Sequence, residues 1–282
     1  MRQSTSFALS AGLSFFLPFA LGCGVILAAP AAAHCATTPA ADPEPERVLL
    51  TTEDGLTLLG TYLPARDAKQ RSPGVVLVHT AGSSRAEMLS LATRMQKSGF
   101  ASLTIDLRGH GESANAALDW KALDAEAQAR AFALMGRDVK AGVDFLLSQK
   151  TVHSTGVSML GHGTGCALVA RQATRDDRVR DIVLVSPLTD GLAGSLAKDL
   201  IDLAGLPMFI ALAKDEAPAA KRLVDACNRV VGGESSIESA VLKLEPEQLL
   251  TDNRLSSDLA RWMKAKAMPT VAASTPDARP KR

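Results

Sequence analysis

Five short apolar runs, separated by stretches of helical character, constrain the fold of this chain more than any other feature. The run at residues 74–79 is apolar at consecutive positions, which is typical of a strand buried on both faces of a parallel sheet. Helical patterns at residues 85–98 and 125–148 lie between them. Such alternation implies right-handed crossovers and a sheet with helices on both faces. The runs cover residues 74–79, 101–106, 156–160, 182–186 and 208–212.

Further elements are predicted before and after this series. Residues 47–52 and 56–62 flank the turn dipeptide Asp54-Gly55 and indicate an opening hairpin. A weaker strand at residues 240–244 precedes an amphipathic helix at 247–266, which we expect to cover the sheet edge. The sequence therefore predicts an α/β architecture of three layers, with a mostly parallel central sheet of about eight strands.

The length and the composition predict one domain with flexible segments at both ends. Of the 282 residues, we assign 47–268 to a single α/β domain, because roughly 220 residues suit one core of this class. Residues 34–46 are rich in Ala, Thr, Pro and acidic side chains and are predicted to form a disordered linker, and residues 269–282 a disordered tail. Residues 1–33 are predicted to be a signal peptide or a membrane anchor.

The first 33 residues predict export from the cytoplasm. Residues 7–33 carry no charge and end in small residues that suit signal cleavage after about Ala33. The same run is long enough for an uncleaved anchor. A third interpretation is lipidation at Cys23, because residues 20–23 (Ala-Leu-Gly-Cys) resemble a lipoprotein box. All three place the domain in the periplasm or outside the cell, with membrane contact only through the N-terminal segment.

Charge and cysteine usage exclude several classes of function. The formal net charge is +1, which provides no basic surface for nucleic acid. Cleavage near Ala33 would leave Cys35, Cys166 and Cys227, too few for a disulfide framework, and their redox state stays open. We expect Cys166 to be a buried apolar residue. Neither a metal-ligand spacing nor a phosphate-binding glycine loop is present, so no metal and no cofactor is predicted.

Three motifs occur in an informative order. Residues 79–83 (His-Thr-Ala-Gly-Ser) follow one predicted strand, and residues 106–113 (Asp-Leu-Arg-Gly-His-Gly-Glu-Ser) follow the next. Residues 161–165 (Gly-His-Gly-Thr-Gly) stand between a strand and a small-residue helix. Together they resemble the α/β-hydrolase fold superfamily, nearest to its dienelactone-hydrolase-like and esterase- or lipase-like members. The resemblance implies the three-layer α/β-hydrolase fold.

The resemblance also implies where a catalytic site would lie. Residues 161–165 match the G-x-S-x-G elbow, whose strained turn presents a nucleophilic serine. Here Gly163 stands at the serine position, so the turn is kept and the hydroxyl is absent. The loop after the third strand and the residue after the nucleophile supply oxyanion-hole donors in this superfamily. Thr80, Ala81 and Thr164 are the corresponding candidates, with Thr80 replacing the usual glycine.

The acid of the triad has a candidate, whereas the base does not. Asp215 follows the strand at residues 208–212, where the acid of the superfamily lies, and Asp190 is a weaker alternative. The base should be a histidine after the last strand, but that region offers only Glu245 and Glu247, which are poor bases for an alcohol. We expect His110 to be structural. The histidines of the chain are His34, His79, His110, His153 and His162, and all precede the position of the nucleophile.

These observations support more than one function, and whether the chain is an enzyme stays open at this point. The first hypothesis is an exported α/β-hydrolase-family protein that lacks serine-hydrolase activity and acts as a binding or interaction module. The alternative is an active carboxylic-ester or acyl hydrolase with a nonstandard site. A third is a membrane-tethered, partner-binding protein. The ligand class implied is a small acyl or ester-like molecule, and no protein partner can be named.

Overall fold

The computed structural model describes residues 42–267, apart from 68, 195, 204, 217, 219, 220, 226, 227 and 229–236. The predictions for residues 1–33, for most of the linker and for the tail at 269–282 therefore lie outside the described residues, as do Cys23, Cys35 and Cys227. None of the described helices combines the length and the apolar character needed to cross a bilayer.

Among the described residues, eight strands form one sheet in the order β1-β2-β4-β3-β5-β6-β7-β8. β1 pairs with β2, and β2 with β4, in antiparallel fashion, and all other neighbours are parallel. The architecture predicted from the apolar runs is therefore confirmed. The strands are β1 (Glu46–Thr51), β2 (Thr57–Leu63), β3 (Ser72–Val78), β4 (Ala101–Ile105), β5 (Val152–His162), β6 (Val179–Val185), β7 (Met208–Ala213) and β8 (Ile237–Leu242).

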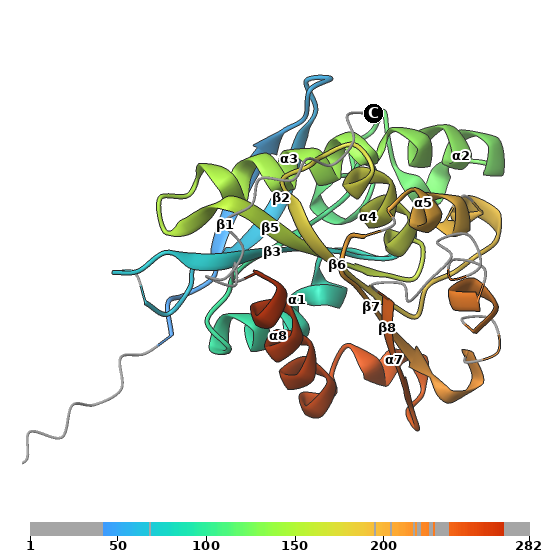
Figure 1. Ribbon diagram of the computed structural model, residues 1–282. Coiled ribbons are helices and arrows are strands. Elements are labelled where there is room, and N and C mark those ends of the chain that lie inside the picture. The colour runs from blue at the N-terminus through green and yellow to red at the C-terminus, as the bar shows by residue number, and fades with distance from the viewer. Residues whose placement is uncertain are drawn as a thin grey trace, which may run out of the picture. The chain divides into compact units, whose positions relative to one another are not determined.

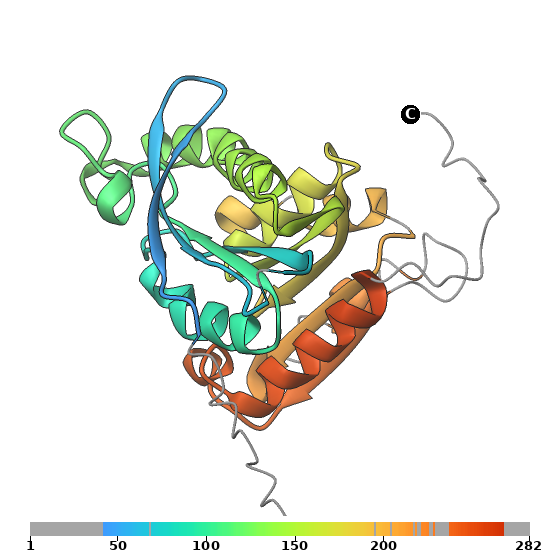
Figure 2. The same cartoon turned by 90° about the vertical axis from the view of Figure 1, so that its left-hand side faces the viewer.

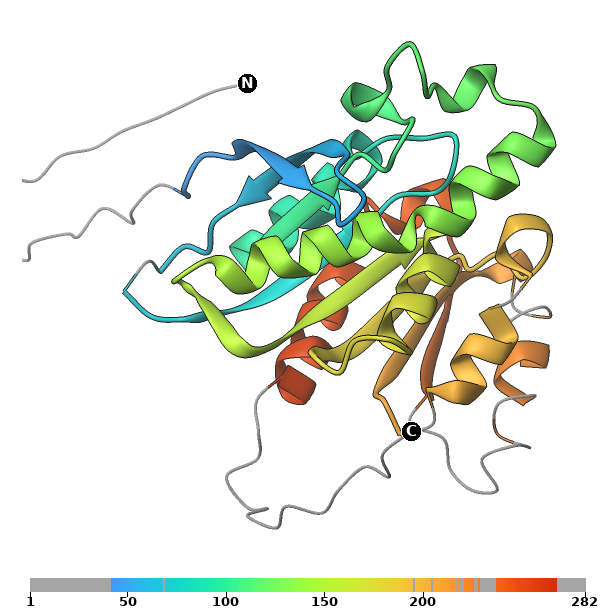
Figure 3. The same ribbon diagram turned by 90° about the horizontal axis from the view of Figure 1, so that it is seen from above.

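Helices cover both faces of this sheet (Figure 1). α3, α4 and α5 lie on one face, as the view from above shows (Figure 3), and α1 and α8 lie on the other, with α8 running along the sheet (Figure 2). β7 is apolar on both faces because each face packs against helices, whereas β4 carries the buried hydroxyl side chains of Ser102 and Thr104. The helices are α1 (Ala86–Lys97), α2 (Ala125–Leu134), α3 (Gly136–Ser148), α4 (Gly165–Ala173), α5 (Leu196–Asp202), α7 (Pro246–Leu249) and α8 (Asn253–Ala267).

Two predicted helices are interrupted, and the domain begins earlier than predicted. The helix predicted at 125–148 is divided into α2 and α3 at Met135, just before Gly136, a poor residue for a helix interior. The helix predicted at 247–266 is divided into α7 and α8. Its break contains Asp252, whose carboxylate accepts the Leu255 N–H at 2.6 Å and so favours a new helix start. β1 begins at Glu46, inside the predicted linker.

A buried carboxyl group lies in the sheet beneath α8. Asp181 of β6 pairs with Ser158 of β5, and the Ser158 hydroxyl donates to Asp181 Oδ2 at 2.8 Å. The other carboxyl oxygen, Oδ1, has no hydrogen-bond partner among the described residues. Burial raises the pKa of Asp181 to about 7, against an ordinary value of 3.8, although the Ser158 bond opposes the shift. The folded state therefore prefers the neutral acid.

This preference makes a prediction about stability and pH. Because the folded pKa lies above the unfolded one, the contribution of neutral Asp181 is complete below pH 3.8 and is lost as the pH rises to about 7. Asp181→Asn mimics the neutral acid, so its stability relative to the native chain should rise over this interval by roughly 3–5 kcal/mol. Urea unfolding at several pH values measures this difference. The exposed control Asp177→Asn should show no such rise, and equal curves for both variants would contradict the assignment.

Candidate functional site

The candidate site lies at the carboxyl edge of the sheet, between β3 and β5. The chain passes from β3 to β4 on one side of β3, whereas β5 lies on the other side. This is a topological switch point, where open α/β sheets generally bind their ligands. The loop at residues 79–85 after β3 and the turn at residues 162–164 after β5 meet there, so the fold brings together the motifs identified in the sequence.

The turn after β5 keeps the geometry of a nucleophile elbow. Gly163 has a φ of +55°, in the region that glycine adopts without strain. A Cβ atom at this position would lie 2.5 Å from Thr80 Oγ1 and 2.9 Å from Thr80 Cβ, closer than real atoms approach. The Thr80 side chain therefore fills the space that a side chain at position 163 would need. The residue types at positions 80 and 163 are therefore sterically coupled.

The predicted oxyanion-hole donors come together, but each already has an acceptor. The Ala81 N–H donates to Thr164 Oγ1 at 2.7 Å, and the Thr164 N–H donates to Thr80 Oγ1 at 3.2 Å. The two hydroxyl oxygens lie 3.2 Å apart. An oxyanion hole must present unpaired donors to the developing negative charge. Here two threonine hydroxyls accept from the Ala81 and Thr164 N–H groups, and the Thr80 N–H donates to Glu87, so all three candidate donors are paired within the chain and the hole is closed.

Glu87 of α1 contacts both the loop after β3 and the elbow. Its carboxylate accepts the Thr80 N–H at 3.0 Å through Oε2, while Oε1 lies 2.7 Å from His162 Nδ1. Burial alone would raise the pKa of Glu87, but the hydrogen bond and charge of His162, with the Thr80 N–H, outweigh it and lower the pKa. Glu87 therefore holds both loops through an ionised carboxylate.

Asp215, the predicted acid, lies in the short turn at residues 214–216 that follows β7. Asp215 is exposed and makes no hydrogen bond or ion pair to the described residues. The next residue, Glu216, points inward instead, where its Oε2 accepts the Ser186 hydroxyl at 2.9 Å and the Ala213 N–H at 2.8 Å. Ser186 has a φ of +47°, a strained conformation for a residue with a side chain. The Glu216 carboxylate thus links the end of β7 to the loop after β6 through hydrogen bonds.

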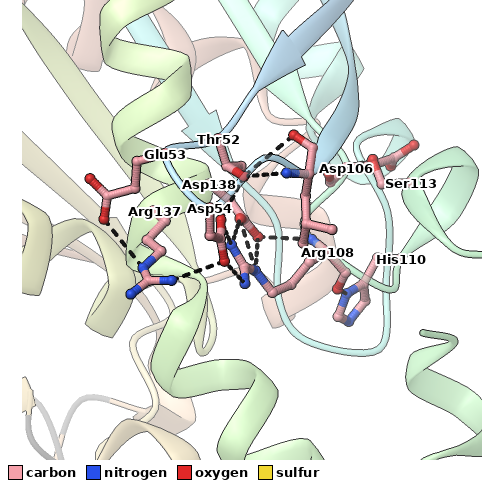
Figure 4. A network of polar contacts seen from close by, with 10 residues as sticks. Thr52, Glu53, Asp54, Asp106, Arg108, His110, Ser113, Arg137 and Asp138 are labelled. Atoms are coloured by element: carbon pink, nitrogen blue, oxygen red, sulfur yellow. Dashed lines mark hydrogen bonds and ion pairs between the residues drawn. The ribbon is translucent and has the colours of Figure 1, made fainter. Parts of the chain in front are cut away.

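The loop after β4 is held by two buried carboxylates (Figure 4). Asp106 accepts the backbone N–H groups of Arg85 at 2.7 Å and Glu112 at 2.9 Å. Arg108 lies between Asp138, at 2.7 Å, and Asp54, at 2.8 Å. Hydrogen bonds from Arg108 lower the pKa of Asp54 despite its partial burial. Asp106 and Arg108 of the motif at residues 106–113 therefore hold this loop in place through buried polar contacts.

The two histidines of these loops are neutral structural residues. His79 Nε2 accepts the Leu107 N–H at 3.2 Å, and burial lowers the pKa of His79 to about 4. His110 Nε2 accepts the Gly82 N–H at 2.9 Å, and burial lowers its pKa as well. An imidazole can accept such a bond only when that nitrogen is unprotonated, so these pKa values fit the geometry. The structural role expected for His110 is consistent with these contacts.

The described residues contain neither a reactive thiol nor a metal centre. Cys166 is fully buried in α4, and burial strongly raises the pKa of its thiol, as expected for a small apolar residue. No group of three or more His, Cys, Asp or Glu side chains gathers in the described part of the chain.

The sequence analysis did not identify Glu87 and Glu216 as residues of the site. Their signal was local position: one lies in the first turn of α1, and the other follows the predicted acid.

Restoring the serine alone should damage the fold, because Thr80 occupies its space. We expect Gly163→Ser to lower the free energy of unfolding by roughly 2–4 kcal/mol, from the backbone conformation and the close contact. Adding Thr80→Gly should recover at least about 1 kcal/mol beyond the sum of the two single effects. A double-mutant cycle by urea unfolding measures this coupling. Ser83→Gly in place of Thr80→Gly, as the matched control, should show no recovery; additivity in both cycles would refute the coupling.

The comparisons with known proteins agree with this fold. The family model described as serine aminopeptidase, S33, matches residues 69–226, which is more than half of the chain. No curated protein is recognisably similar in sequence. An esterase of Pyrococcus furiosus superposes with a TM-score of 0.61 at 17% identity, covering 79% of this chain and 91% of the esterase.

Two further solved structures are similar. Dienelactone hydrolase from Anabaena variabilis has a TM-score of 0.61 at 16% identity, covering 80% of this chain and 97% of its own. The 2,6-dihydroxy-pseudo-oxynicotine hydrolase has a TM-score of 0.62 at 18% identity, covering 79% of this chain and 68% of that hydrolase. At these identities the likeness concerns the fold. The family match and the elbow at the switch point together show that the chain belongs to the serine aminopeptidase, S33, family and carries the α/β-hydrolase fold.

Proposed function

We propose that this chain is an exported member of its family that lacks serine-hydrolase activity and serves as a binding or interaction module. The observation that carries the proposal is the closed oxyanion hole. The Thr80 and Thr164 hydroxyls and the Glu87 carboxylate satisfy the three candidate donors, and Thr80 fills the space of the nucleophile. A triad enzyme that loses one member already loses several orders of magnitude in rate. Here the nucleophile and the base are both absent from the sequence.

The other titratable side chains of the described site are engaged in structural contacts. His162, the histidine of the elbow, is bound to Glu87, and His79 and His110 use both ring nitrogens in structural contacts. Glu216 already accepts two hydrogen bonds. Residual catalysis in triad variants comes from the oxyanion hole and from binding. Because the hole is filled, we expect even this residual contribution to be absent.

The test is hydrolysis by the purified full chain. The substrates are p-nitrophenyl acetate, butyrate and octanoate, together with aminoacyl p-nitroanilides, because the family description names an aminopeptidase. We expect no turnover above that of the heat-unfolded chain. The matched variants are Asp215→Ala and Thr164→Val. Turnover by the native chain that falls in either variant would overturn the proposal in favour of an active acyl hydrolase with a nonstandard site.

Export is the second part of the proposal, and it rests on the sequence of residues 7–33, which carries no charge. We expect the native protein to begin after about Ala33, as for a cleaved signal. Intact-mass analysis of protein recovered from the producing cell measures the N-terminus. A lipid-bearing mass starting at Cys23, or retention of residues 1–33, would replace cleavage by lipidation or by an anchor. Recovery of an unmodified full chain from the cytoplasm would refute export.

A further inference from the structure

The charged side chains of the helices are unevenly distributed, although the formal net charge of the chain is only +1. The helices α2, α3, α4 and α5 together carry five cations and five carboxylates, so their charges cancel. α1 and α8, on the other face of the sheet (Figure 1), carry six cations and only two carboxylates. These six cations are Arg94, Lys97, Arg254, Arg261, Lys264 and Lys266.

The two groups of helices also differ in how their cations are paired. Each of the five cations on α2 to α5 has a carboxylate partner, as Lys140 has in Asp144 at 2.7 Å. On α8, Arg261 pairs with Asp258 at 3.1 Å and Lys266 pairs with Glu238 at 3.2 Å. The remaining four cations have no carboxylate at ion-pair distance among the described residues. They are Arg94, Lys97, Arg254 and Lys264.

Helix stability explains only part of this surplus of positive charge. Lys97 and Lys264 lie in the last turns of their helices, where the helix dipole favours a cation. Arg254 lies in the first turn of α8, where the dipole disfavours one. Its side chain is exposed, so it does not contribute to the core either. The presence of Arg254 therefore indicates that this surface is basic for a reason other than folding.

The unpaired cations belong to one continuous surface. α1 and α8 pack against each other, and the Arg94 Nε group donates to Asn253 Oδ1 at the start of α8 at 2.7 Å. At the other end of α8, Lys264 Nζ lies 5.9 Å from the ring centroid of Phe100, which follows α1 closely in the chain. We call the outer surface of the two helices, with Arg94, Lys97, Arg254 and Lys264, the basic face.

The chain enters the domain beside the basic face. Gln96 of α1 donates from Nε2 to the Pro43 carbonyl oxygen at 2.9 Å, and Lys97 is the next residue. Residues 34–42 separate Pro43 from the predicted export segment, and nine residues span at most about 30 Å. A membrane that holds this segment would therefore lie within reach of the basic face.

We propose that the basic face binds the anionic headgroups of a phospholipid membrane. The sequence predicts membrane contact only through the N-terminal segment, so this surface provides a second contact. Anionic lipid surfaces attract clusters of Lys and Arg through charge alone. Because the buried sides of α1 and α8 pack on the sheet, the two helices stay in the domain and present only their cations to the lipid. The inference rests on the exported binding role proposed above and names the partner of that role.

The test is co-sedimentation with vesicles of the protein recovered from the producing cell. Vesicles that contain phosphatidylglycerol are compared with vesicles of phosphatidylcholine alone, and only the former should bind strongly. Each cation contributes about fivefold to membrane affinity. The combined variant Lys97→Gln, Arg254→Gln and Lys264→Gln should therefore bind anionic vesicles roughly a hundredfold more weakly.

The matched control removes the same number of charges from the other helices. The combined variant Arg130→Gln, Lys140→Gln and Lys198→Gln should bind anionic vesicles like the native chain, because these cations are paired and lie elsewhere. In about 1 M salt, where the screening length falls to about 3 Å, the native chain should be released. Equal losses in the two variants, binding that does not require phosphatidylglycerol, or retention in high salt would overturn the proposal.

A second measurement uses the native chain, so it does not depend on the folding of a variant. Acetylation of lysines should be slower at Lys97 and Lys264 when anionic vesicles are present, and unchanged at Lys140 and Lys198. The reverse pattern would place another surface on the membrane and refute the assignment. Binding of duplex DNA without binding of the vesicles would overturn the choice of lipid as the partner.

This proposal and the proposed loss of activity can fail separately. Ester turnover in the earlier assay would refute the loss of activity and leave the vesicle result intact. Absence of vesicle binding without any turnover would refute only the role of the basic face. The intact-mass measurement defines the N-terminus of the protein used here, so a retained N-terminal segment is recognised before the vesicle data are interpreted.

Discussion

The close packing of the β5–α4 turn against the end of β3 is the constraint on which this structure depends. A Cβ atom on Gly165 would lie 2.6 Å from the Val78 carbonyl oxygen and 2.7 Å from that of His79. Only a glycine lets the helix begin so near the neighbouring strand. This contact brings Gly163 and Thr164 against Thr80. A substitution in the loop after β3 or in the turn after β5 therefore changes the packing of the other segment.

In this setting the two departures from the family pattern belong together. Thr80 places a methyl and a hydroxyl group in the small volume that a side chain at position 163 would need. Interiors tolerate such exchanges when the total volume is kept. The hydroxyls of Thr80 and Thr164 also satisfy the backbone donors that an empty hole would leave unpaired. The result is a stable switch point without an exposed reactive group.

Much of the fold could be predicted from the sequence, because strands buried on both faces are continuous apolar runs and helices have a different period. The missing nucleophile and base could also be read directly from Gly163 and the positions of the histidines. The pairing of the oxyanion-hole donors could not be predicted, because it depends on the distance between Thr80 and Gly163, which are far apart in the sequence. The choice between Asp215 and Glu216 depends on one short turn after β7, and local propensity does not decide which carboxylate faces inward.

The Thr80–Gly163 contact has a consequence for how such a protein can change over time. A chain that has exchanged these volumes meets a steric barrier to regaining a serine by a single codon change, since the intermediate is less stable before it gains any chemistry. Under the proposed function, the same contact would make the absence of the nucleophile hard to reverse, because a serine at position 163 would have to displace the Thr80 side chain before it could take part in any reaction.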